Sequence, residues 1–189
     1  MRHIYETRSI VLSRTPVGEA NMLLTLLTSE LGLVRVNAQG VRRSGAKLAS
    51  SLTTFAESHI TLLRGREVWR VSGAILKENW FERMSDIAAR RCAVRVCGLL
   101  TRLVTGEMPD LTLFSIMVGF FEALTEPTSD AYDSVEVLAL LRILAALGLD
   151  EHETLEEPSV FVGESLVRVA RDRSDYIARI NRGIAVSGL

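Results

Sequence analysis

The feature that most constrains the fold of this chain is a change in hydrophobic period near residue 80. Up to Lys77, short segments rich in Val, Ile, Thr and Leu alternate with turn-forming sequences, at the spacing of a small all-β barrel. From Ser85 onward, apolar residues recur at helical spacing. A chain of 189 residues can form two small domains with separate cores. The sequence therefore predicts an α+β protein, with a β domain over residues 1–80 and a helical domain over residues 81–189.

The N-terminal domain is predicted to be an OB-fold. A short helix is expected at Lys47–Phe55, between the third and fourth strands. Five strands with a helix in this position is the element order of the OB-fold, whose second and third strands and connecting loops bind oligonucleotides. Other small barrels share parts of this pattern and stay open as alternatives. The expected strands are Ile4–Arg14, Asn21–Ser29, Leu33–Gln39, Glu57–Arg64 and Val68–Lys77.

The C-terminal domain is predicted to be a helical bundle. A cap at Ser85-Asp86 begins a helix that runs to about Val104 and carries one apolar face. Helices at Leu111–Leu124 and Ser134–Leu147 are apolar on most sides, which is typical of helices packed on several faces. A last helix is expected over residues 164–182.

Charge is distributed unevenly along the chain, although its net charge is only −1. Residues 1–80 hold 11 Lys and Arg against 6 Asp and Glu, whereas residues 81–163 hold 6 against 14. A polyanion is therefore attracted to the first domain and repelled by the second. Solvated surfaces without any partner are the alternative explanation.

A basic loop is the most informative local feature. Arg35 lies on the third predicted strand, and the following loop places basic residues around Gly40 and Gly45. Guanidinium and ammonium groups on such a loop can follow a phosphate backbone without reading bases, although ordinary surface loops are also basic. Arginines around the next hairpin could extend the groove. The candidate nucleic-acid-binding residues are Arg35, Arg42, Arg43, Lys47, Arg64, Arg66 and Arg70.

Catalysis is not expected, and no catalytic residue is assigned. The G-x-x-x-x-G-A-K sequence from Gly40 to Lys47 differs from a P-loop because Ala46 stands where the phosphate-binding lysine is required. No nucleophile elbow, H-E-x-x-H or dinucleotide glycine pattern occurs. His152 lies in an acidic loop and is interpreted as solvated.

No metal or other cofactor is expected either. The two cysteines, Cys92 and Cys97, are interpreted as small buried side chains, and the three histidines are scattered. Trp69 and Phe55 could stack on bases. Alternation along Val68–Lys77 puts Trp69 on the same side as Val71 and Ile75, however, and both aromatic residues are assigned to the core. The most apolar stretch is too short to span a membrane, and the charged N-terminus lacks the apolar core of a signal peptide, so a cytosolic protein without membrane contact is expected.

The segment YETRSIVLSRTPVGEANMLLTLLTSELGLVRVNAQGVRRSGAKL resembles the start of RecO, the bacterial recombination mediator, and the later LLRILAALGL is similar to the RecO helical domain. The resemblance implies a protein that binds single- and double-stranded DNA, anneals complementary strands, and works with RecR to load RecA onto strands coated by single-strand-binding protein. It assigns DNA binding to Arg35, Arg42, Arg43 and Lys47. Many members carry a four-cysteine zinc module where this chain has LDEHETLEEPSVFVGES, without cysteine.

A partner surface is expected on the first long helix, where Arg91, Arg95 and Arg102 form a basic stripe. An acidic, apolar peptide such as the tail of single-strand-binding protein would fit this stripe, and a solvated helix face is the alternative. Two rival functions stay open for the whole chain. One is an OB-fold protein that binds single-stranded RNA or DNA in general, and the other is a protein-interaction scaffold whose barrel binds no nucleic acid.

Overall fold

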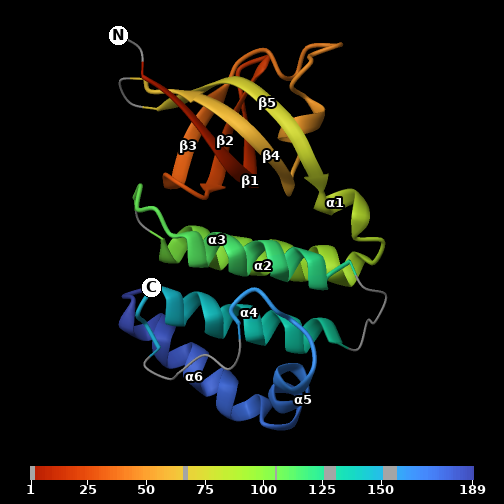
Figure 1. Cartoon of the computed structure of the whole chain (residues 1–189), viewed down its shortest axis with the longest axis vertical. Coiled ribbons are helices and arrows are strands. Elements are labelled where there is room, and N and C mark those ends of the chain that lie inside the picture. Colours follow the sequence, from red (N-terminus) through yellow and green to blue (C-terminus); the bar gives the residue numbers. More distant parts are fainter. Residues whose placement is uncertain (1–2, 66–67, 105, 126–130, 151–156) are drawn as a thin grey trace. The chain divides into compact units, whose positions relative to one another are not determined.

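The computed structural model describes residues 3–65, 68–104, 106–125, 131–150 and 157–189 (Figure 1). Its contacts divide the chain into two compact units. The barrel unit consists of Met1–Glu82 with Thr105–Asp110, and the helical unit consists of Arg83–Val104 with Leu111–Leu189. Within the described residues, none of the helices combines the length and apolarity that a membrane crossing requires.

The barrel unit confirms the prediction of a five-stranded OB-type sheet ahead of the helices. The sheet closes in the order β1-β2-β3-β5-β4, in which β3 and β5 are parallel and the other neighbours are antiparallel. The strands are β1 Ile4–Val17, β2 Asn21–Thr28, β3 Gly32–Ala38, β4 Ala56–Leu63 and β5 Trp69–Asn79. The first strand therefore extends three residues beyond its predicted end at Arg14, through Pro16, which pairs with Met22.

Alternate residues of the strands fill the barrel, as period-2 alternation requires. Leu24, Val36 and Leu62 are fully buried in one core cluster that also contains Trp69. Phe55 is 1% exposed, so the assignment of both aromatic residues to the interior is confirmed. Phe55 reaches this position with a positive φ of 61°, and its N–H donates to the carbonyl oxygen of Val11 at 2.9 Å.

The predicted side of Ile75 is wrong. Trp69 and Val71 face the core, but Ile75 is 74% exposed. The register between β4 and β5 shifts at Thr61/Leu62, which leaves one extra residue in β5 near Ser72. A β-bulge of this kind reverses the alternation, so that Ala74 packs against the core and Ile75 points outward.

The predicted bounds of the short helix at Lys47–Phe55 are also wrong. Only Ser50–Leu52 forms a helix, a single 3₁₀ turn called η1, and consecutive i to i+3 hydrogen bonds lead into it. Thr53 is extended and ends the turn, and Phe55 with its positive φ cannot continue a helix. The apolar residues of this segment nevertheless contribute to the core, because Leu48 packs against it and Leu52 is buried in it.

The helical unit contains the helices that the period predicted, with two corrections. A short helix α1, Trp80–Arg83, precedes the first long one at the boundary of the units and was not predicted. The predicted last helix over residues 164–182 is two helices, because the chain leaves helical geometry at Asp172, with φ −106° and ψ 32°. The remaining helices are α2 Ile87–Leu103, α3 Leu111–Ala123, α4 Tyr132–Ala146, α5 Glu164–Arg171 and α6 Arg173–Val186.

The core of the helical unit includes both cysteines as free, buried thiols, which confirms their structural interpretation. Burial raises the pKa of each thiol far above its usual range. The cap at the start of α2 is as predicted, since the Asp86 carboxylate accepts a hydrogen bond from the Ala88 N–H at 2.7 Å. His152 lies outside the described residues.

Candidate nucleic-acid interface

The outward side of β1, β2 and β3 is a polar surface that we call the open face. Ser13, Thr25 and Arg35 are directly opposed across the three strands and therefore share a side of the sheet. The next cross-strand row continues onto β5, where Arg70 is opposite Asn37. No carboxylate occurs in these two rows. The open face consists of Ser13, Thr15, Leu23, Thr25, Arg35, Asn37 and Arg70.

The basic loop after β3 is attached to the turn that joins β1 to β2. The backbone N–H of Arg42 donates to the carbonyl oxygen of Ala20 at 3.1 Å, and its guanidinium Nη1 donates to that of Gly18 at 2.9 Å. The backbone N–H of Gly40, which has a φ of +69°, donates to Oδ1 of Asn21 at 2.9 Å. These bonds hold the start of the loop beside the strand ends of the open face.

Three basic side chains of the barrel are already paired with carboxylates. Arg8 and Lys77 both donate to Oε1 of the buried Glu57, at 2.7 and 2.9 Å. Burial raises the pKa of Glu57, but the hydrogen bonds and charges of Arg8 and Lys77 outweigh burial and hold the pKa below its usual range. Arg64 forms an ion pair with Glu107. These three cations are neutralised within the barrel unit.

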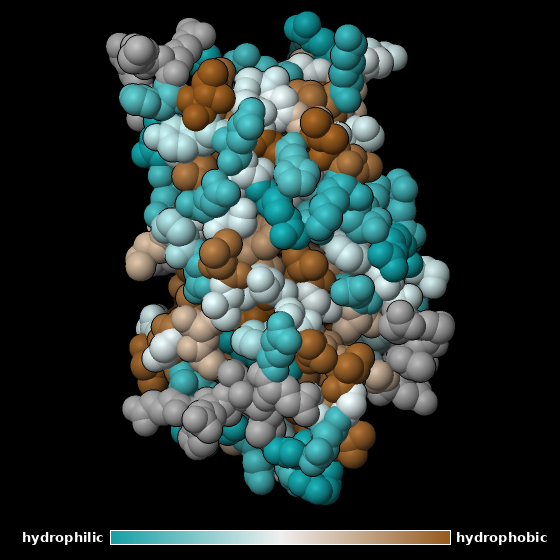
Figure 2. All heavy atoms as spheres, in the orientation of Figure 1, coloured by the Kyte–Doolittle hydropathy of each residue, from teal (hydrophilic) through white to brown (hydrophobic). Residues whose placement is uncertain are grey.

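Five other predicted cations are described by the structure, and all five are exposed. Among the described residues, no ion pair joins a carboxylate to any of these five side chains. The β3–β4 connection that carries three of them projects from the barrel in Figure 1, and hydrophilic atoms cover that corner in Figure 2. Arg66 lies outside the described residues. The five exposed, unpaired cations are Arg35, Arg42, Arg43, Lys47 and Arg70.

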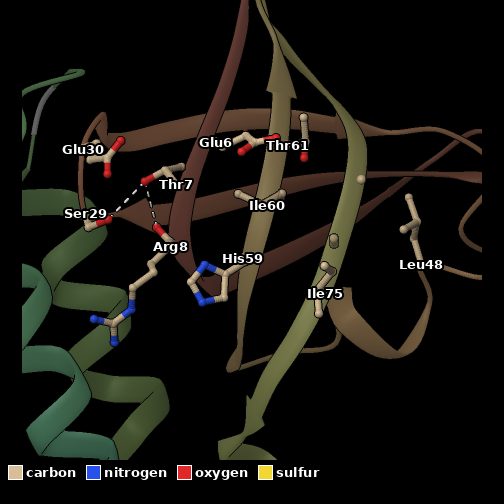
Figure 3. Close-up of a pocket in the computed structure, with 12 residues that line it drawn as sticks. Glu6, Thr7, Arg8, Ser29, Glu30, Leu48, His59, Ile60, Thr61 and Ile75 are labelled. Atoms are coloured by element: carbon tan, nitrogen blue, oxygen red, sulfur yellow. Dashed lines mark hydrogen bonds between the residues drawn. The ribbon is translucent and has the colours of Figure 1, made fainter.

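A separate hollow of about 590 Å³ runs along β1, β4 and β5. Figure 3 shows Arg8 and His59 lying side by side at its edge, with Ile75 on the neighbouring strand. Its charged lining is mixed, because Glu6 and Glu30 also contribute. None of the predicted nucleic-acid-binding residues that the structure describes lines this hollow, so those basic residues belong to a different surface.

The arginine stripe of the helical unit is present but not uniform. Arg91 and Arg102 are exposed on α2, whereas Arg95 donates from Nε to Oε1 of Glu136 at 2.7 Å and forms a second, parallel bond. Ile87 and Val94, both more than half exposed, occur on the same side of the helix as Arg91. The stripe therefore combines two available cations with apolar surface.

The prediction from single sequence segments missed the polar members of the open face, such as Asn37 and Thr25. Strand alternation in the sequence contained this signal, since both residues alternate with apolar core positions. It also missed the pairing of Arg64 with Glu107, which depends on a distant part of the chain. In the part of the chain that the structure describes, no three His, Cys, Asp or Glu side chains gather in a way that could hold a metal ion.

Residues 1–80 match the family model described as "Recombination protein O N terminal". The DNA repair protein RecO of Dehalococcoides mccartyi strain 195 is 30% identical over 126 residues, which is 67% of this chain and 50% of the relative. The DNA repair protein RecO of Roseiflexus sp. RS-1 is 31% identical over 145 residues, 77% of this chain and 50% of the relative.

A third relative, the DNA repair protein RecO of Exiguobacterium sibiricum, is 23% identical over 192 residues, 96% of this chain and 76% of the relative. The chain spans about half the length of the first two relatives. The family match covers the whole barrel, and the relatives extend the similarity into the helical unit. Residues 1–80 therefore belong to the family of RecO N-terminal domains, and the rest of the chain is similar to RecO proteins.

Proposed function

We propose that this protein is a DNA repair and recombination mediator that binds single-stranded DNA on the barrel, without catalysing a reaction. The observation that carries the proposal is the clustering of unpaired cations: Arg42, Arg43 and Lys47 on the loop, with Arg35 on the adjacent carboxylate-free open face. Cations that pair with no carboxylate among the described residues can exchange their counterions for phosphates. The names of the RecO relatives support a role in DNA repair.

Binding should depend steeply on salt and little on base sequence, because the proposed contacts go to phosphates. If about four phosphates are neutralised, the slope of log affinity against log salt is near −3 for a single strand, so affinity falls roughly sixtyfold between 50 and 200 mM salt. The double variant Arg42→Glu, Arg43→Glu should flatten the slope by about one to two units. Fluorescence anisotropy titrations of a labelled oligonucleotide over a salt series measure both quantities.

The matched control is Arg91→Glu, Arg102→Glu, which changes the net charge of the chain by the same amount but on α2. It should leave the salt slope close to that of the wild type. Equal slopes and affinities for the wild type and the loop variant, with the fold intact by circular dichroism, would falsify the loop assignment. The same titrations with RNA separate a DNA-specific mediator from a general single-strand binder, and no binding even at low salt would indicate an interaction scaffold.

The fuller activity implied by the family is also part of the proposal: annealing of strands, and loading of RecA together with RecR. We place a second partner site on α2, where Arg91 and Arg102 flank exposed apolar residues. An acidic peptide with apolar side chains, such as the tail of single-strand-binding protein, matches both properties. Arg95 contributes less there, because Glu136 already neutralises it.

The variant Arg91→Glu, Arg102→Glu should weaken binding of this tail peptide by about tenfold, the loss expected for two exposed charged contacts. Isothermal titration calorimetry with the synthetic peptide measures the change. The loop variant Arg42→Glu, Arg43→Glu is here the control and should bind the peptide as the wild type does. An unchanged peptide affinity in the α2 variant would move the partner site elsewhere.

A further inference from the structure

The connection between α2 and α3 brings a carboxylate onto the barrel unit. Glu107 lies in the segment that belongs to this unit, and its Oε1 accepts a hydrogen bond from the indole Nε1–H of Trp69 at 2.9 Å. Its other oxygen, Oε2, pairs with the guanidinium of Arg64. One carboxylate is therefore held by two donors, an indole N–H and a guanidinium.

The aromatic rings of Trp69 and Tyr5 lie beside the Arg64 guanidinium and against each other. The guanidinium carbon of Arg64 lies 4.5 Å from the centroid of the Trp69 ring. The ring of Tyr5 meets the same indole edge-on, with centroids 5.0 Å apart and an interplanar angle of 86°. Tyr5 is 38% exposed and Trp69 is 4% exposed, so of the two rings only that of Tyr5 is open to a ligand.

A guanidinium and an N–H that converge on one oxygen pair also suit a phosphate, and the exposed ring of Tyr5 is a surface on which an unpaired base can stack. We propose that Arg64, Trp69 and Tyr5 form a second contact for single-stranded nucleic acid, whose phosphate position is occupied by Glu107 in the free protein. This inference rests on the proposed function, since it concerns the same ligand on the same domain.

The acidic segment Gly106–Asp110, which we call the strap, is held in a way that permits exchange. The side chains of Arg64 and Glu107 are 50% and 42% exposed, so water and salt weaken their attraction. Met108 is 74% exposed and provides no apolar anchor. Burial raises the pKa of Glu107, but hydrogen bonds from Trp69 and Arg64 bring it below its usual range, so Glu107 competes as an anion at neutral pH.

The position of the strap depends on Gly32, at the start of β3. A Cβ atom at Gly32 would lie 2.1 Å from the carbonyl oxygen of Met108, and Gly32 has a φ of +71°. The backbone of the strap thus rests directly on the β2–β3 connection, and Glu107 is the adjacent residue. The backbone contact between Gly32 and Met108 sets the position of Glu107 on the barrel. The side-chain contacts of Glu107 with Arg64 and Trp69 determine whether its carboxylate remains bound there.

The test compares Glu107→Gln with Glu30→Gln, which removes the same charge from another exposed position of the barrel. Glu107→Gln should raise oligonucleotide affinity about fivefold above the gain from Glu30→Gln, the factor expected for one exposed ion pair and one hydrogen bond. Arg64→Ala should change affinity less than about twofold in the wild type, and should remove the gain in the Glu107→Gln background.

A direct readout comes from the indole N–H resonances of the two tryptophans, assigned with Trp80→Phe. Adding oligonucleotide should shift the Trp69 resonance in the wild type. Equal gains in oligonucleotide affinity from the two Gln variants, with no shift of the Trp69 resonance, would overturn the inference that Glu107 blocks a second contact. DNA binding by the basic loop would remain in place. Failure of both the wild type and Glu107→Gln to bind would overturn the inference and the proposed function together, whereas binding by Glu107→Gln alone would support the inference.

Discussion

Replacing Arg142 by alanine should lower the free energy of unfolding of the helical unit by about 4 kcal/mol. Arg142 lies on α4 and is 1% exposed, and its Nη1 donates to the carbonyl oxygens of Pro158 and Val160 at 3.0 and 2.7 Å. Its guanidinium carbon also lies 4.6 Å from the centroid of the Phe161 ring. Truncation leaves partly buried carbonyl oxygens without donors, removes the cation–π contact and creates a cavity, each costing roughly 1–2 kcal/mol.

Urea denaturation of the wild type and Arg142→Ala, followed by far-ultraviolet circular dichroism, measures this loss. Arg91→Ala is the control, because an exposed arginine on α2 should change the free energy of unfolding by less than about 0.5 kcal/mol. Arg142→Lys should fall between the two, since one ammonium cannot reproduce a planar guanidinium stacked on a ring. A loss below about 1 kcal/mol for Arg142→Ala would show that the segment at Pro158–Phe161 does not depend on this side chain.

Gly119→Ala should destabilise the same unit by about 3 kcal/mol or more, although alanine is the better helix former. Gly119 lies inside α3, and a Cβ atom there would be 1.9 Å from the carbonyl oxygen of Ser159 and 2.8 Å from its carbonyl carbon. Backbone atoms cannot rotate away as a flexible side chain does, so the helix or the segment around Ser159 must move.

The comparison that isolates this clash is Gly98→Ala, inside α2, where a Cβ atom meets nothing within 4 Å. That substitution should stabilise the unit by about 0.5–1 kcal/mol, because it reduces the entropy of the unfolded chain without a steric cost. The midpoints of thermal unfolding should therefore move in opposite directions for the two variants. Midpoints that rise together would mean that the segment around Ser159 adapts freely to α3.

The two units differ in how far the sequence predicted them. The strand and helix periods, each a property of neighbouring residues, correctly predicted a barrel followed by helices and the buried positions of Trp69, Cys92 and Cys97. The predicted bounds of the helix at Lys47–Phe55 were wrong because apolar spacing over one turn also suits a 3₁₀ turn, and Phe55 adopts a positive φ. The predicted side of Ile75 was wrong because a single extra residue in β5 reverses the alternation of inward and outward side chains.

The role of Arg142 also could not be predicted from the sequence alone. In the sequence, Arg142 interrupts the most apolar stretch and counts against a membrane span. In the fold, it is a buried donor to the segment that packs on α3 and α4, and its partners Pro158 and Val160 follow it by 16 and 18 residues. Burial of a charged side chain requires such acceptors, and only the packed structure supplies them.

By itself, the sequence determined the order of the two units, the excess of positive charge in the first, and the basic composition of the loop from Gly40 to Lys47. The tertiary structure decided which of those charges have partners. Arg8 pairs with Glu57, 49 residues away, and Arg64 with Glu107, 43 residues away, while Arg35 and Arg42 pair with no carboxylate among the described residues. Coulomb attraction acts over a few ångströms in space, and strand pairing and the path of the chain, rather than distance along the sequence, determine which charges come that close.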